Sequence, residues 1–101
     1  MDIDLLSLED PFEYDDDNQP HLFKHAYSKD DILDIWYSDP LFFPARDGGS
    51  ADWLMVGRPP GEEPLVVPLA PSRKDDYRKC RPIGVYKASG DVLSQYLQAQ
   101  G

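Results

Sequence analysis

The sequence lacks the features that mark several specialised classes of protein. Cys80 is the single cysteine among 101 residues, so the chain forms no internal disulfide and no cysteine-based zinc site from its own ligands. No apolar run approaches the roughly 20 residues that a transmembrane helix needs. The first residues also lack the basic and apolar regions of a secretory signal. We therefore expect a cytoplasmic protein that does not span a membrane.

Basic residues are absent from the first 20 positions, which carry eight of the 19 acids. The rest of the chain holds eleven acids and ten bases, so the net charge of −9 divides into an acidic arm and a nearly neutral body. Within that body one stretch, residues 72–88, would attract phosphate. Its bases are Arg73, Lys74, Arg78, Lys79, Arg81 and Lys87. The plain alternative is a solvated basic loop.

The neighbours of Cys80 leave two interpretations of its thiol open. Lys79 and Arg81 flank it, and adjacent cations lower the pKa of a thiol and raise its reactivity. The alternative is an inert cysteine beside a basic loop.

The length suits one domain. We expect residues 1–11 to be a mobile arm and residues 12–101 to form the domain, which begins with two helices. Asn18 as an N-cap and Pro20 in the first turn predict a helix to about residue 27. A second helix follows Ser28, which forms a capping-box pattern with Asp31.

The spacing of apolar residues then changes to that of strands. Residues 41–46, 53–58 and 65–69 are separated by turn sequences, which predicts an antiparallel meander. Residues 82–88 are a candidate fourth strand. Pro68 cannot donate a ladder hydrogen bond, so we expect it at an edge, at a bulge or at a strand end.

The final segment predicts a helix with Ser89 as its N-cap and an apolar stripe that packs across one face of the sheet. The stripe consists of Val92, Leu93, Tyr96 and Leu97. The expected architecture is therefore α+β, with two N-terminal helices, three or four antiparallel strands and a C-terminal helix packed on the sheet.

Several short motifs occur along the chain in a fixed order. Residues 12–15 read Phe-Glu-Tyr-Asp, and residues 21–26 read His-Leu-Phe-Lys-His-Ala. Gly57-Arg58 ends a predicted strand, and a Leu-Val-Val strand follows it. Residues 81–88 read Arg-Pro-Ile-Gly-Val-Tyr-Lys-Ala, and Tyr96 comes eight positions later. In this order the motifs resemble the BrnT family of bacterial toxins, small ribonucleases of type II toxin–antitoxin pairs with a RelE-like fold.

The resemblance implies a ribonuclease that needs no metal or other cofactor, an RNA substrate and an antitoxin protein as partner. It implies four catalytic residues, namely Lys24, His25, Lys87 and Tyr96. Arg58, Arg78 and Arg81 would contact phosphate, and Tyr86 would stack on a base. His25 is the best general acid or base, because histidine titrates near neutrality. Plain alternatives are a helix-end His25 bonded to a carbonyl and an Arg58 paired with Glu62 or Glu63.

The chain also departs from the family pattern. Tyr86 stands where the family has Arg, Val92 where it has Glu, and Ala26 where it has Gly, while Pro68 interrupts a strand. A second hypothesis is therefore a catalytically inactive, protein-binding module on the same scaffold. A third is that the acidic arm folds over residues 73–87 and mimics the charge of RNA, with a solubilising tail as its alternative.

Asp17, His21 and His25 have the i, i+4, i+8 spacing of metal ligands on one helix face. Because the expected helix begins after Asp17, we expect no metal site there. The sequence does not indicate an oligomeric state.

Overall fold

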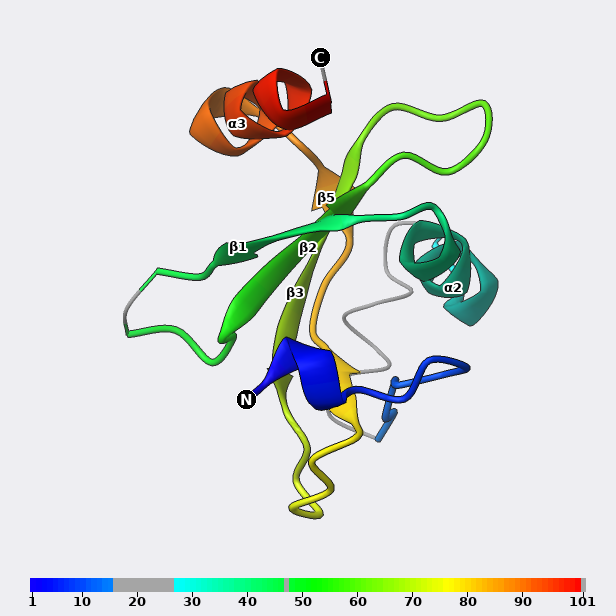
Figure 1. The fold of residues 1–101 in the computed structure, drawn as a ribbon, viewed down its shortest axis with the longest axis vertical. Helices are drawn as coiled ribbons and strands as arrows, with labels where there is room; N and C mark the ends of the chain where they lie inside the picture. The colour runs from blue at the N-terminus through cyan, green and yellow to red at the C-terminus, as the bar shows by residue number, and fades with distance from the viewer. Residues whose placement is uncertain (16–26, 47, 101) are drawn as a thin grey trace.

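The computed structural model describes residues 1–15, 27–46 and 48–100. Its elements in chain order are the 3-10 helix η1 (Ile3–Leu5), α2 (Lys29–Tyr37), β1 (Leu41–Pro44), β2 (Trp53–Gly57), β3 (Leu65–Pro71), β4 (Cys80–Pro82), β5 (Tyr86–Lys87) and α3 (Gly90–Gln100). The expected α+β class, with an antiparallel sheet and a C-terminal helix, is confirmed (Figure 1). The helix expected over residues 18–27 falls almost wholly outside the described residues. No helix in the described ranges has the length and apolar character needed to cross a bilayer.

The sheet is the predicted three-stranded meander, extended by the two short strands β4 and β5. Its order is β1-β2-β3-β4, and β5 also pairs with β3. Because β2 occupies one edge of β3 over the whole length of β2, β4 and β5 share the other edge. The long third strand is therefore the centre of the sheet.

The strand expected over residues 82–88 is broken into β4 and β5, and Pro68 lies opposite the break. Between the pairs Ala70–Arg81 and Leu65–Lys87, β3 advances five residues and its partner six, which is the count of a β-bulge. The Pro68 carbonyl accepts a hydrogen bond from the Ile83 N–H at 3.0 Å. The Pro68 nitrogen has no hydrogen to donate, and it faces the irregular segment between β4 and β5. Of the three expected positions for Pro68, the bulge is the one observed.

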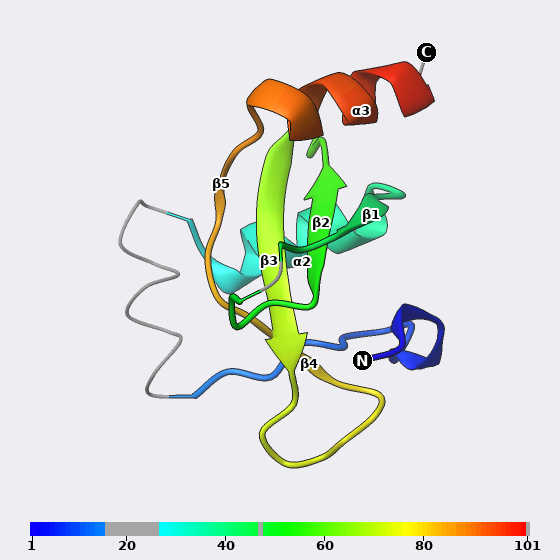
Figure 2. The same cartoon turned by 90° about the vertical axis from the view of Figure 1, so that its left-hand side faces the viewer.

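Each face of the sheet carries its own apolar cluster, because successive strand residues point to opposite faces. The first face bears Met55, Leu65, Val67, Leu69 and Cys80 and is covered by α2 and the N-terminal segment. The second face bears Val56 and Val66, on which Tyr96 of α3 packs. Figure 2 shows α3 crossing one end of the sheet, as a separate layer from α2.

Helix α2 begins where the sequence predicts, directly after Ser28. The Ser28 hydroxyl accepts from the Asp31 N–H, and the Asp31 carboxylate accepts from the Ser28 N–H at 2.7 Å, so the capping box is complete. Ile32 and Ile35 are fully buried on the sheet side of the helix. The helix approaches the end of β2 so closely that a Cβ on Gly57 would stand 2.7 Å from Ser38 Oγ. This contact explains why the Gly-Arg motif needs its glycine.

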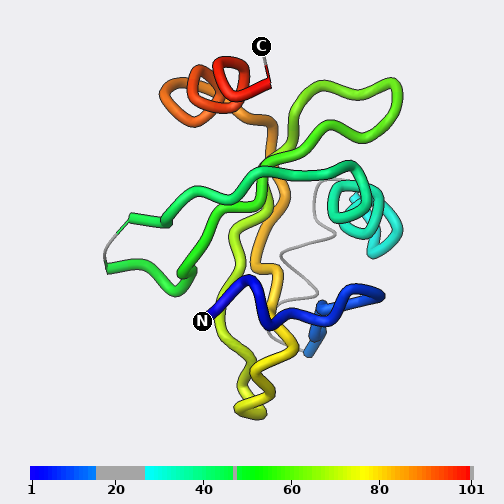
Figure 3. The backbone as a smooth tube through the Cα atoms, viewed as in Figure 1, coloured from blue at the N-terminus to red at the C-terminus, as the bar shows by residue number. Residues whose placement is uncertain are grey.

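Residues 1–15 lie on the body instead of extending away from it. Leu6, Pro11 and Phe12 are buried, and Phe12 forms an isolated parallel bridge with Cys80. The Phe12 ring meets the Trp36 ring edge-on, with the centroids 5.9 Å apart. Figure 3 shows this blue segment running beside the chain that leads into β4. The expected arm is therefore a part of the folded domain in this structure.

Strand β1 is the edge of the sheet, and prolines limit its capacity to pair further. The Ala45 N–H donates to the Asp52 carbonyl, so alternation turns the backbone groups of positions 42 and 44 to the free edge. Position 44 is a proline, and Pro40 precedes the strand. Phe42 is then the one strand residue that offers an N–H to this edge, which disfavours strand addition.

Candidate functional site

The residues implied by the BrnT resemblance do not all come together. Lys24 and His25 lie outside the described residues, as do the metal-spaced Asp17, His21 and His25. Within the described ranges no group of three or more His, Cys, Asp or Glu side chains could hold a metal ion.

Arg81 and Lys87 lie far apart and on opposite faces of the sheet. Arg81 pairs with Ala70 and Lys87 with Leu65, so five residues of β3 separate the two positions, or about 16 Å at about 3.3 Å per residue. Ala70 and Leu65 point to opposite faces, and their paired residues follow them. The bulge opposite Pro68 reverses the alternation between them, so these two cations do not share a face of the sheet.

Arg58 and Lys87 do lie at one end of the sheet. Gly57, the residue before Arg58, pairs with Leu65, which also pairs with Lys87. Lys87 Nζ lies 3.7 Å from Glu63 Oε2, and both side chains are well exposed, so this pair contributes little to stability. The expected pairing of Arg58 with Glu62 or Glu63 is not seen among the described residues.

Tyr96 is a core residue in this structure. Its side chain is 5% exposed and packs against Val56 and Val66. A catalytic tyrosine must reach the reacting atoms, whereas this ring is occupied in joining α3 to the sheet. The other three stripe residues of α3 are half-buried or exposed.

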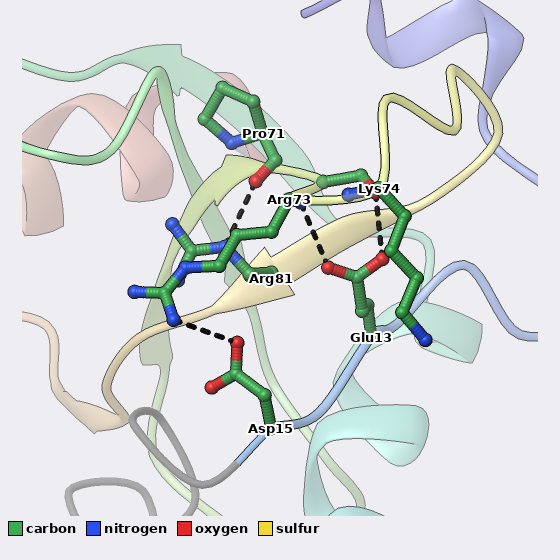
Figure 4. A network of polar contacts seen from close by, with 7 residues as sticks. Glu13, Asp15, Pro71, Arg73, Lys74 and Arg81 are labelled. Carbon is green, nitrogen blue, oxygen red and sulfur yellow. Dashed lines mark hydrogen bonds and ion pairs between the residues drawn. The ribbon is translucent and has the colours of Figure 1, made fainter.

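The loop between β3 and β4 is held by carboxylates of the N-terminal segment (Figure 4). Ser72 Oγ accepts from the Lys74 and Asp76 N–H groups at 3.1 and 3.3 Å, which leaves its own hydrogen to be donated outward. It donates to Glu13 Oε1 at 2.7 Å, and the Arg73 N–H donates to Glu13 Oε2 at 3.0 Å. The loop thus presents a preformed pair of donors that the Glu13 carboxylate fills.

Further contacts tie the same segment to the basic stretch. Arg73 Nη1 donates to Asp15 Oδ2 at 3.2 Å, and Lys79 Nζ donates to the Asp10 carbonyl at 2.7 Å. Arg81 Nε instead donates to the Pro71 carbonyl at 3.0 Å, while Arg78 lies 3.9 Å from Asp76. The acidic segment therefore covers part of the basic stretch, and four of the bases there already have partners.

Cys80 is buried within the first apolar cluster. Burial, with a smaller contribution from the Glu13 charge, raises the pKa of its thiol to about 12. The thiol is therefore protonated at neutral pH, and a reactive cysteine is not what the fold provides.

A groove lies on the second face of the sheet, between β5, α3 and the connection from β1 to β2. Its volume is about 510 Å³, and we call it the α3 groove. Its apolar wall is formed by Leu54, Val66, Ile83, Tyr86 and Val92. The polar and small residues around it are Ala45, Arg46, Gly49, Ser50, Ala51 and Ser89.

Two of the departures from the family pattern, Tyr86 and Val92, line this groove together. Tyr86 is 48% exposed, and partial burial raises the pKa of its hydroxyl. The sequence marked both residues as unusual but gave no sign that they meet. The alternation of Leu54 and Val66 toward the second face was the available signal for the rest of the wall.

Comparisons of the chain with models of protein families, with characterised proteins and with solved structures find no match.

Proposed function

We propose that this chain is a BrnT-like protein-binding module on a RelE-like scaffold, and that it binds a partner protein in the α3 groove without cleaving RNA. The observation that carries the proposal is that Tyr86 and Val92 line the same groove. In the resembled family these positions hold Arg and Glu. An aromatic and an aliphatic side chain in their place remove the positive and the negative charge of that pair, and they present apolar surface of the kind found at protein interfaces.

The placement of the cations supports the same proposal. Stabilising the transition state of RNA cleavage requires donors that converge on the developing charge. Arg81 and Lys87 lie on opposite faces, and a carboxylate already binds Arg73. The net charge of −9 also opposes sequence-independent RNA binding, which depends on neutralising phosphates.

The test combines a binding measurement with a nuclease measurement on the full chain. The first partner to examine is the product of a neighbouring small reading frame, co-expressed with this chain. Tyr86→Arg/Val92→Glu restores the charges of the family pattern and should weaken the complex about tenfold or more, as expected for central interface positions. Tyr77→Arg is the matched control, because Tyr77 is a 67% exposed aromatic outside the groove.

The nuclease arm uses the same proteins, with RNA over a wide range of salt and enzyme concentration. We expect intact RNA from the full chain and from His25→Ala alike. RNA cleavage that disappears in His25→Ala would refute the proposal. A stable complex that tolerates Tyr86→Arg/Val92→Glu would show that the partner does not bind in the α3 groove.

A metal-independent ribonuclease with an antitoxin as partner is the second candidate. The observation in its favour is that Arg58 and Lys87, both implied by the resemblance, lie at the same end of the sheet. This candidate predicts growth arrest on expression, relieved by His25→Ala or Lys87→Ala. It also predicts that Arg81→Ala has less effect than Lys87→Ala, because Arg81 lies on the other face.

A further inference from the structure

The loop between β3 and β4 orients its donors independently of the Glu13 carboxylate that it holds. Ser72 Oγ accepts from the N–H groups of Lys74 and Asp76 at 3.1 and 3.3 Å, so its own hydrogen stays directed outward when the carboxylate leaves. The Arg73 N–H is the second donor to the same carboxylate. We call these two donors, together with the Arg73 guanidinium, the loop site (Figure 4).

The charge around the loop site favours an anion, although the chain as a whole is acidic. Residues 71–81 carry five bases and two acids, which gives this stretch a net charge of +3. The Arg81 guanidinium lies at the start of the loop, because its Nε donates to the Pro71 carbonyl at 3.0 Å. Donors and cations therefore coincide at this part of the surface, where the local field attracts anions.

Two carboxylates of the N-terminal segment occupy the loop site together. Glu13 accepts from Ser72 Oγ and from the Arg73 N–H through both of its oxygens, and Asp15 accepts from Arg73 Nη1 through one of its oxygens. A phosphate monoester carries about −1.5 to −2 charges near neutral pH and offers three strong acceptor oxygens. The two carboxylates therefore present to the loop site the charge and the acceptors of one phosphate group.

The two carboxylates can leave the loop site without detaching the backbone that carries them. The Glu13 N–H donates to the Cys80 carbonyl at 2.7 Å, and the Phe12 side chain is buried, so the main chain is anchored by contacts of its own. The side chains of Arg73 and Asp15 are 49% and 29% exposed, and an ion pair open to solvent contributes little to stability. An external anion therefore replaces Glu13 and Asp15 by rotation of two side chains.

We propose that the loop site binds a phosphate dianion, free or as a monoester, and that Glu13 and Asp15 close the site in its absence. The phosphate oxygens accept from Ser72 Oγ and from the Arg73 N–H, and they pair with the Arg73 guanidinium. Figure 2 shows the β3–β4 loop at the opposite end of β3 from α3. Phosphate at the loop site and a partner protein in the α3 groove are therefore separate events, and neither requires the other.

Calorimetric titration of the full chain and its variants with inorganic phosphate and with O-phosphoserine, at constant ionic strength, measures the affinity of the loop site. Glu13→Ala removes the tethered competitor, so Kd should fall to about 1 mM or below and at least about tenfold below that of the parent chain. Glu9→Ala is the matched control, because Glu9 is an exposed acid of the same segment, and it should change Kd by less than about twofold. Adding Ser72→Ala to Glu13→Ala should raise Kd about tenfold again.

The two probes distinguish the sources of the phosphate. Tighter binding of O-phosphoserine assigns the site to a monoester, and tighter binding of inorganic phosphate assigns it to the free ion. Three results would overturn the proposal: Glu13→Ala gains no more affinity than Glu9→Ala, Ser72→Ala leaves Kd unchanged, or a dinucleotide whose only phosphate is a diester binds as tightly as O-phosphoserine.

Urea unfolding in phosphate keeps the test decisive if Glu13→Ala is partly unfolded. A ligand that binds only the folded state raises the midpoint of unfolding, whereas the general effect of phosphate as a salt acts on every variant alike. Phosphate should therefore raise the midpoint of Glu13→Ala by more than it raises that of Glu9→Ala. Equal rises in the two variants would also overturn the proposal.

Discussion

Replacing Gly57 by alanine tests the closest contact between α2 and the sheet. The added Cβ would stand 2.7 Å from Ser38 Oγ, 3.0 Å from Ile35 Cγ2 and 3.2 Å from the Ile35 carbonyl oxygen. Ile35 is fully buried and has little room to move. Ser38 Oγ donates to the Ile35 carbonyl at 2.7 Å, so a rotation that relieves the contact breaks this hydrogen bond.

These terms set the expected loss of stability. Overpacking a tight site costs about 1 to 3 kcal/mol, and a lost partly buried hydrogen bond costs about 1 kcal/mol. Against them, replacing glycine at a conformation open to alanine returns about 0.4 to 1 kcal/mol by restricting the unfolded chain. We expect the free energy of unfolding to fall by about 1 to 3 kcal/mol.

Urea unfolding followed by tryptophan fluorescence measures this loss, because Trp36 and Trp53 lie in α2 and β2. The midpoint should fall by about 1 to 2 M at an unchanged slope. Gly49→Ala is the matched control, since its added Cβ meets nothing closer than the Arg46 carbonyl at 3.8 Å. If Gly57→Ala unfolds at the same urea concentration as Gly49→Ala, the close approach of α2 is wrong.

The Ser38→Ala background separates the two causes. Without Oγ the nearest obstacle to the new Cβ is removed, while the contacts with Ile35 remain. Gly57→Ala should then cost about 1 kcal/mol less than it does with Ser38 present. Equal costs in both backgrounds would place the whole effect on Ile35.

Further predictions concern the N-terminal segment and the buried thiol. Leu6→Ala should lower the free energy of unfolding by about 2 to 4 kcal/mol, because Leu6 is only 5% exposed. Leu8 is 85% exposed, so Leu8→Ala should change the free energy of unfolding by less than about 0.5 kcal/mol. Equal effects of the two substitutions would show that residues 1–11 are a free arm. Glu13→Gln should cost about 1 to 2 kcal/mol in urea unfolding by weakening two charge-assisted hydrogen bonds, and an unchanged midpoint would contradict that contact. Burial raises the pKa of the Cys80 thiol from an ordinary 9.0 to about 12 in the folded chain. The unfolded state therefore loses this proton first as pH rises. The free energy of unfolding should fall above about pH 9, by up to about 1.4 kcal/mol per pH unit. Cys80→Ala should flatten the stability profile between about pH 9 and 10, and a profile as steep as that of the parent chain would assign the loss to other groups.

The parts of the fold that the sequence predicted correctly are those with local signals. The Ser28 and Asp31 capping box lies within four residues, and the turns of the meander are marked by glycine and proline. By contrast, Glu13 meets Ser72 across 59 positions of sequence. The opposite charges of the two segments support the hypothesis that the arm folds over residues 73–87, but nothing local indicates that Glu13 fills the two donors at Ser72 and Arg73.

Arg81 and Lys87 lie on opposite faces of the sheet because of the number of residues between them. Arg81 and Lys87 are six residues apart, and in one unbroken strand an even separation places both side chains on one face. The extra residue opposite Pro68 changes that relation, and the length of the irregular segment could not be predicted from its composition. The α3 groove was equally hidden, because Tyr86 and Val92 line it from two different elements, β5 and α3.

Pro68 has a consequence for how the molecule opens. The Pro68 nitrogen donates no ladder hydrogen bond, so the far edge of β3 pairs with two separate units, which we call flaps. The first flap consists of β4 with residues 1–15, and the second consists of β5 with α3. Detaching the second flap breaks no pairing of the first, so we expect amide exchange to proceed at distinct rates in the two. A binder at α3 would then slow exchange in its own flap alone and leave the protection of Cys80 and Phe12 unaltered.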